Sequence, residues 1–93
     1  MKISYSPEAV ADLVRLREFI EVNNPDAARR VATALKRGIG QLKTFPHMGV
    51  EVPQAPSPKM VRDLIIGKYT VRYLLRSSDI YILRVWHHRE NRL

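Results

Sequence analysis

Residues 6–31 read SPEAVADLVRLREFIEVNNPDAARRV, and this stretch contains the same helix-start signal twice. In SPEA, residues 6–9, the serine is a good N-cap, the proline suits the first helical position and the glutamate complements the helix dipole. In NPDA, residues 24–27, asparagine, proline and aspartate take the same three roles. A connection of one or two residues makes consecutive helices antiparallel, so the sequence predicts a helical hairpin over about residues 7–44.

Apolar residues recur at helical spacing in both halves of this hairpin. In the first half we expect a wide apolar stripe toward the core, formed by Val10, Leu13, Val14, Leu16, Phe19 and Ile20, with Arg17 among them. In the second half the expected inner face is Ala28, Val31, Ala32, Leu35, Ile39 and Leu42. Gly38 and Gly40 weaken the last turns of the second helix by about 1 kcal/mol each relative to alanine.

The apolar period changes from 3.6 to 2 after a proline-bearing segment. Residues 45–59 hold four prolines and Gly49, which predicts a loop with a short extended piece at 50–52. Three β-rich runs follow, with a Gly-Lys turn and the segment RSSD between them. Consecutive strands with short links predict an antiparallel meander over about residues 60–88.

A short β-favouring run at residues 2–5 completes the predicted order, β-α-α-β-β-β. The fold class is therefore α+β, with the helical hairpin covering one face of a small sheet. Ninety-three residues make one domain, residues 1–93, which ends in a basic tail at 89–93.

The composition excludes several classes of protein. The chain has no cysteine, which rules out a disulfide framework and a thiolate metal site. Its three histidines, His47, His87 and His88, have neither ligand spacing nor neighbouring acids, so no metal site is expected. The start MKISYSPEAV lacks the apolar region of a signal peptide, and no apolar run approaches the roughly 20 residues that span a bilayer. We therefore expect a cytoplasmic protein with no membrane partner.

Positive charge is concentrated at one end of the chain. Residues 1–58 carry eight basic and six acidic side chains, net +2, whereas residues 59–93 carry eight basic and three acidic, net +5. Such an excess indicates an acidic or polyanionic partner for that end, with a plain solubility surface as the alternative.

Strand alternation divides the charged residues between two faces. In the run at 68–75 the two tyrosines and Val71 mark the core side, and Arg72 lies on the opposite side. In the last run Tyr81, Leu83, Val85 and His87 alternate with Ile80, Ile82, Arg84, Trp86 and His88. Arg84 needs water or a partner, and a face free of helices supplies room for it beside Arg72. Arg62 either lies at the rim of that face or pairs with Asp63 or Asp79 on the surface.

The order of these motifs resembles the RelE/ParE superfamily of toxins from bacterial type II toxin–antitoxin systems. The resemblance covers nearly the whole chain and rests on the capped hairpin, an Arg-Asp-Leu strand at 62–64, GKYTVRYLL at 67–75 and DIYILRVWHHRE at 79–90. It implies a toxin held inactive in a hetero-oligomer by an acidic, ParD-like antitoxin that is disordered until it wraps the toxin. No cofactor is expected. An upstream reading frame for that antitoxin is expected. A chain of net charge +7 suits such a partner.

Two branches of the superfamily imply different targets. RelE-like members cut messenger RNA on the ribosome without a metal, which requires cations on the phosphate and a base and an acid nearby. Arg62 and Arg84 would hold the phosphate, and His87 or His88 would transfer protons. An RNA base would stack on Trp86 or Tyr81. ParE-like members poison DNA gyrase and lack the nuclease residues.

Three features favour the ParE-like branch. The chain has no tyrosine after His88, residues 45–59 lack a lysine cluster, and the hairpin with its NP-x-AA motif resembles that branch. We therefore predict a gyrase-inhibiting toxin, with an mRNA endoribonuclease as the alternative. A basic nucleic-acid-binding module is the third hypothesis, although neither a helix-turn-helix nor an RNP motif is present. The residues expected to contact the target are Arg62, Arg72, Arg84, Trp86, His88, Arg89 and Arg92.

Overall fold

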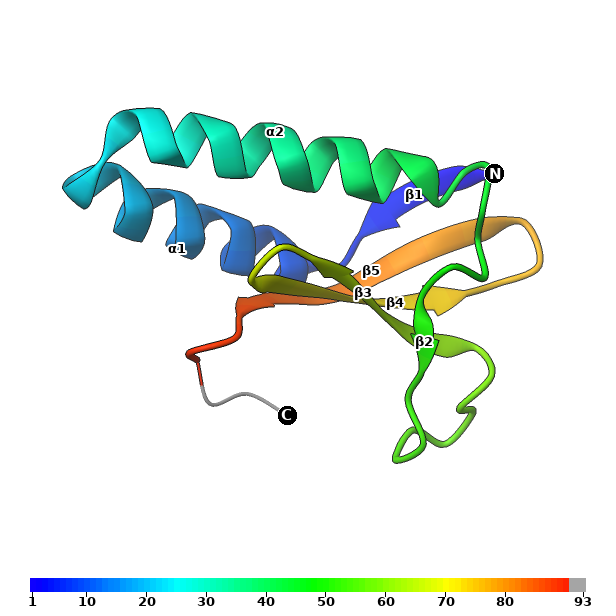
Figure 1. Ribbon diagram of the computed structural model, residues 1–93. Helices are drawn as coiled ribbons and strands as arrows, with labels where there is room; N and C mark the ends of the chain where they lie inside the picture. The colour runs from blue at the N-terminus through cyan, green and yellow to red at the C-terminus, as the bar shows by residue number, and fades with distance from the viewer. Residues whose placement is uncertain (91–93) are drawn as a thin grey trace.

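The computed structural model describes residues 1–90, which form a helical hairpin over a five-stranded sheet (Figure 1). The predicted α+β order is confirmed, and the extended piece expected at 50–52 is a two-residue strand. The elements are β1 Lys2–Tyr5, α1 Pro7–Asn23, α2 Pro25–Gln41, β2 Val50–Glu51, β3 Val61–Ile66, β4 Tyr69–Leu75 and β5 Asp79–His87. No helix within residues 1–90 is both long and apolar enough to cross a bilayer.

The sheet is mixed, in the order β1-β5-β4-β3-β2. The predicted meander forms its centre, where β3, β4 and β5 pair antiparallel. At one edge β1 pairs parallel with β5, and at the other β2 pairs antiparallel with the start of β3. Gly67 makes the tight turn between β3 and β4 with a φ of 59°, a left-handed conformation that suits glycine.

Both helices begin where the capping signals predict. The Ser6 hydroxyl accepts a hydrogen bond from the Ala9 amide at 2.9 Å, and the Asn24 side chain accepts one from Ala27 at 3.1 Å. Each cap satisfies an amide that the helix itself leaves without a partner.

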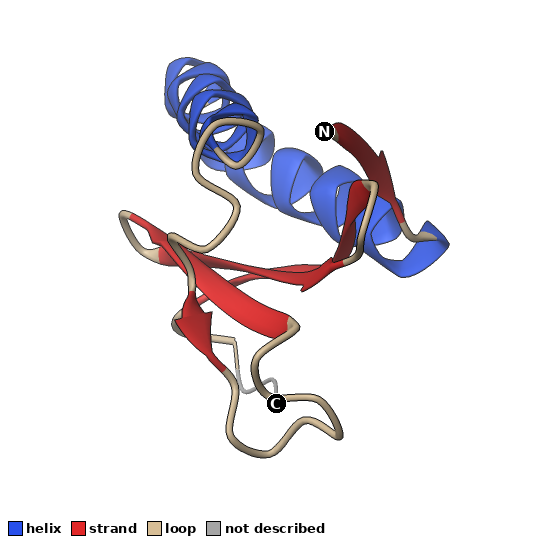
Figure 2. Ribbon diagram, turned by 90° about the vertical axis from the view of Figure 1, so that its right-hand side faces the viewer, coloured by secondary structure: helices blue, strands red, loops and turns tan. Residues whose placement is uncertain are grey.

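Figure 2 shows both helices on the same side of the sheet, as predicted, which leaves the other side without a helical cover. The core lies between these two layers. Its fully buried members include Leu42 from the end of α2, Val71 and Tyr73 from β4, and Ile80 and Val85 from β5.

The predicted stripe on the first helix is wrong in part. Val10, Val14 and Phe19 are 49%, 44% and 71% exposed, whereas Ala9, Asp12 and Leu16 form the buried line of α1. The reason is the placement of the helix, which packs along the outer margin of β5 and touches it through one narrow line of residues. Val10, Val14 and Phe19 lie outside that line and are therefore exposed to solvent.

The simple alternation predicted for the last strand also fails, because β5 contains a bulge. Tyr73 pairs with Ile82 and Arg72 pairs with Arg84, so Leu83 is an extra residue without a partner in β4. A bulge changes which side chains share a face. Ile82 therefore joins Val85 in the core, and Arg84 lies opposite Arg72.

Candidate interaction surfaces

Side chains at the start of α1 cover the part of β5 that extends beyond β1. The Ser6 amide donates to the Ile82 carbonyl at 2.9 Å, and the Ser6 hydroxyl donates to the Leu83 carbonyl at 2.8 Å. Further along the same strand, the Val85 amide donates to Asp12 Oδ2 at 2.9 Å. An exposed strand edge is a template for unwanted pairing, and these contacts close it.

Asp12 joins this strand edge to two arginines. Arg84 donates from Nε to Oδ2 at 2.8 Å and from Nη2 to Oδ1 at 3.0 Å, and Arg15 donates to Oδ1 at 2.7 Å. The Asp12 side chain is 2% exposed and that of Arg84 38%, so the pair lies at the margin of the core. Sequence reasoning missed Asp12; its signal is a carboxylate three residues after Ala9 and four before Leu16, on the line that becomes buried.

The surroundings of Asp12 favour its ionised form. Burial by itself raises the pKa of this carboxyl, but hydrogen bonds from Arg84, the Val85 amide and Arg15 outweigh it and lower the pKa to about 2. The carboxylate is therefore a charged anchor at any pH where the protein functions.

This pKa predicts a loss of stability in acid. An unfolded aspartate has a pKa of about 3.9, so the folded state gains stability from Asp12 above that pH and loses it as pH falls through 4 toward 2. We expect the loss to be roughly 2 kcal/mol, since one pKa unit corresponds to about 1.4 kcal/mol. Urea unfolding at pH 7 and pH 2.5 measures it, and Asp12→Asn, which cannot titrate, should lack that component. An equal acid loss in the variant would contradict the assignment.

The side of the sheet away from the helices carries Arg72, Arg84 and Trp86, which we call the open-face cluster. Arg72 donates to both carboxylate oxygens of Asp63, at 2.8 and 2.9 Å, and its guanidinium lies 5.1 Å from the Trp86 ring centroid. The hydrogen bond to Asp63 raises the pKa of Arg72. Trp86 is only 9% exposed. Both arginines of the cluster therefore have a carboxylate as their partner.

Arg62 lies apart from this cluster. It is the cross-strand partner of Tyr73, on the side of the sheet that faces the core. Its guanidinium donates to the carbonyls of Lys59, His47 and Gly49 at 3.1, 3.2 and 2.9 Å. Both placements considered from the sequence are therefore wrong. Arg62 does not lie at the rim of the open face, and the carboxylate near it is Glu51, at 3.6 Å, rather than Asp63 or Asp79.

The two histidines at the end of β5 make different contacts. His88 Nε2 lies 3.1 Å from the Thr70 hydroxyl, and the His88 amide donates to the Lys68 carbonyl. The His87 ring meets Tyr69 edge-on at 5.0 Å, and its Nδ1 accepts from the amide of Arg89, an exposed residue. Arg92, also predicted to contact the target, lies outside the described residues.

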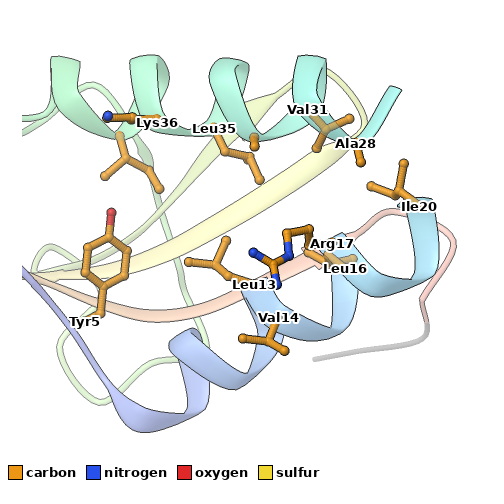
Figure 3. Close-up of a pocket in the computed structure, with 12 residues that line it drawn as sticks. Tyr5, Leu13, Val14, Leu16, Arg17, Ile20, Ala28, Val31, Leu35 and Lys36 are labelled. Carbon is orange, nitrogen blue, oxygen red and sulfur yellow. The ribbon is translucent and has the colours of Figure 1, made fainter. Parts of the chain in front are cut away.

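An apolar groove runs between the two helices (Figure 3). Its volume is about 270 Å³. Apolar side chains of α1 and α2 form its walls, and Arg17 and Lys36 add positive charge. The apolar lining residues include Leu13, Val14, Leu16, Ile20, Ala28, Val31 and Leu35.

Comparison with known proteins finds a matching family model and similar curated proteins. A family model described as "ParE toxin of type II toxin-antitoxin system, parDE" matches residues 3–92. Two curated proteins of Caulobacter vibrioides are similar to this chain. Toxin RelE2 is 28% identical over 86 residues, covering 92% of this chain and 93% of the relative. Toxin RelE1 is 29% identical over 89 residues, covering 94% and 92%.

A solved structure described as "Chromosomal ParDE TA system from P. aeruginosa" shares the fold. One of its chains superposes on this one with a TM-score of 0.76 at 21% identity. The match covers 94% of this chain and 95% of that chain, so the shared fold extends over nearly the whole of both.

Proposed function

Because this chain belongs to the ParE toxin family of type II toxin–antitoxin systems, we propose that it inhibits DNA gyrase and is neutralised by an acidic antitoxin. The family implies an antitoxin partner. The choice between gyrase and messenger RNA as the target depends on whether the arginines of the sheet are available to bind a phosphate.

The observation that supports gyrase is the pairing of those arginines. A nuclease needs cations that bind the scissile phosphate and stabilise its developing charge. In this chain Arg84 is bonded to Asp12, Arg72 is bonded to Asp63, and Arg62 donates to three backbone carbonyls. RNA would have to displace a carboxylate from each of the first two. A surface of compensated charges with one tryptophan suits a protein partner better.

The second candidate is a ribosome-dependent mRNA endoribonuclease. It is favoured by the names of the two Caulobacter relatives, both of which are RelE toxins. In that case His88, whose Nε2 lies 3.1 Å from the Thr70 hydroxyl, is the candidate for proton transfer.

For the antitoxin, the groove between α1 and α2 is the proposed docking site. Its apolar walls suit the apolar face of an amphipathic helix, which binds such grooves through residues spaced by three and four. Arg17 and Lys36 at the groove and a net charge of +7 suit acidic residues on the same helix.

Two assays on the purified chain test the target. We expect it to stop DNA supercoiling by gyrase and to trap cleaved DNA, while a cell-free translation reaction continues with intact messages. Adding the antitoxin encoded beside it should restore supercoiling. Cleavage of ribosome-bound messages by a chain that leaves gyrase active would contradict the proposal and establish the endoribonuclease.

A further inference from the structure

The turn that follows α2 is held rigid by two side chains from the sheet. The Tyr73 hydroxyl donates to the Pro46 carbonyl at 2.7 Å and accepts from the Gly49 amide at 3.0 Å. Arg62 Nη1 donates to the carbonyls of His47 and Gly49. Tyr73 is fully buried, and burial raises its pKa. Residues 45–49, which the sequence predicted only as part of a loop, therefore have one defined backbone conformation.

Arg62 also brings a second segment to this turn. Its Nε donates to the Lys59 carbonyl, so the backbone at residue 59 and the turn meet at one guanidinium. The side chains of both segments point to solvent. We call them the turn surface, which consists of Phe45, His47, Met48, Lys59 and Met60.

The turn surface exposes apolar side chains on an ordered backbone. Phe45 is 62% exposed, Met48 44% and Met60 48%. Phe45 and Met48 line the same pocket, and exposed large apolar groups that lie together mark interaction sites. A rigid backbone loses little conformational entropy on binding, so aromatic and aliphatic anchors on it contribute strongly to affinity.

Two observations indicate the partner. The segments on either side of the turn carry Lys43 and Lys59, and the acidic neighbour Glu51 is already paired to Arg62, so an acidic partner is favoured. The turn surface also continues into the open face. Val50, 66% exposed, directly follows the turn and is the cross-strand partner of Asp63, the residue that binds Arg72. Cross-strand partners point to the same face of a sheet.

We infer that the turn surface is a contact of this toxin with its protein target, where Phe45 and Met48 enter an apolar site that has acidic side chains around it. This inference rests on the proposed function, in which the target is gyrase. Arg62 then acts as a positioning residue, because it orders the turn that presents the anchors.

The double variant Phe45→Ala, Met48→Ala tests this inference. Both side chains are exposed, so we expect an unchanged melting temperature and at least a 10-fold higher concentration for half-inhibition of gyrase, the size typical of an interface anchor. Phe19→Ala is the matched control, since Phe19 is 71% exposed on α1, and it should inhibit gyrase like the unmodified chain. Protection of gyrase by the antitoxin encoded beside the toxin should be the same for all three chains.

The remaining outcomes separate this inference from the proposed function. Full gyrase inhibition by the double variant would overturn the inference. So would a double variant that inhibits gyrase but escapes the antitoxin, since the surface would then belong to the antitoxin. If the unmodified chain leaves gyrase active, the proposed function fails, and growth arrest decides about the surface. A folded double variant that no longer arrests growth supports a target contact, and one that still arrests growth overturns it.

Discussion

Replacing Asp12 with alanine is expected to lower the free energy of unfolding by about 3 kcal/mol, because within residues 1–90 Asp12 is the one charged residue that is buried. The substitution leaves the Val85 amide without an acceptor at the strand margin and takes away the carboxylate that binds Arg84. A buried donor without a partner costs about 1 to 3 kcal/mol, and a broken ion pair with one buried member adds to it. In a domain of this size the melting temperature should fall by roughly 10 to 20 °C.

Asp26→Ala is the matched control for this prediction. Asp26 also pairs with an arginine three residues later on a helix, but both side chains of that pair are largely exposed. Exposed pairs contribute little, so the melting temperature should stay within about 3 °C of that of the unmodified chain. Thermal unfolding followed by circular dichroism measures both variants, and similar losses in the two would show that Asp12 is not an anchor.

Gly49→Ala is expected to destabilise the fold by about 2 kcal/mol or more, through crowding rather than backbone strain. A Cβ at position 49 would lie 2.7 Å from both Cε1 and Oη of Tyr73 and 3.1 Å from Cβ of Arg62. Tyr73 is fully buried and its hydroxyl is bonded on both sides, so the ring has nowhere to move. The backbone at Gly49 has no positive φ, so space alone requires glycine here.

The same substitution at Gly40 should have the opposite sign. A Cβ at Gly40 meets no atom within 4 Å, and the residue lies exposed inside α2. Alanine in a helix is favoured over glycine by about 0.5 to 1 kcal/mol, so Gly40→Ala should stabilise the chain. Urea unfolding compares the two variants directly. A Gly49→Ala chain as stable as the unmodified one would contradict the packing described for the turn.

Much of the candidate site could be predicted from the sequence, but the role of each residue could not. Arg84 and Arg72 were expected together on the face without helices, and they pair across β4 and β5 there. The partners of these arginines, Asp12 and Asp63, lie 72 and nine residues away. Arg62 was expected at the rim of the same face, whereas it orders the turn after α2. The roles of the predicted target contacts remain predictions.

Local signals determined the elements of this protein. Caps at Ser6 and Asn24, glycine at the tight turn and the change of period depend on neighbouring residues alone, which is why the two helices and the meander could be predicted. Three features could be seen only in the folded chain: how β1 and α1 share the margin of β5, where the bulge at Leu83 falls, and which carboxylate each arginine binds. Those outcomes depend on residues far apart in the chain, whose contacts exist only after the layers have packed.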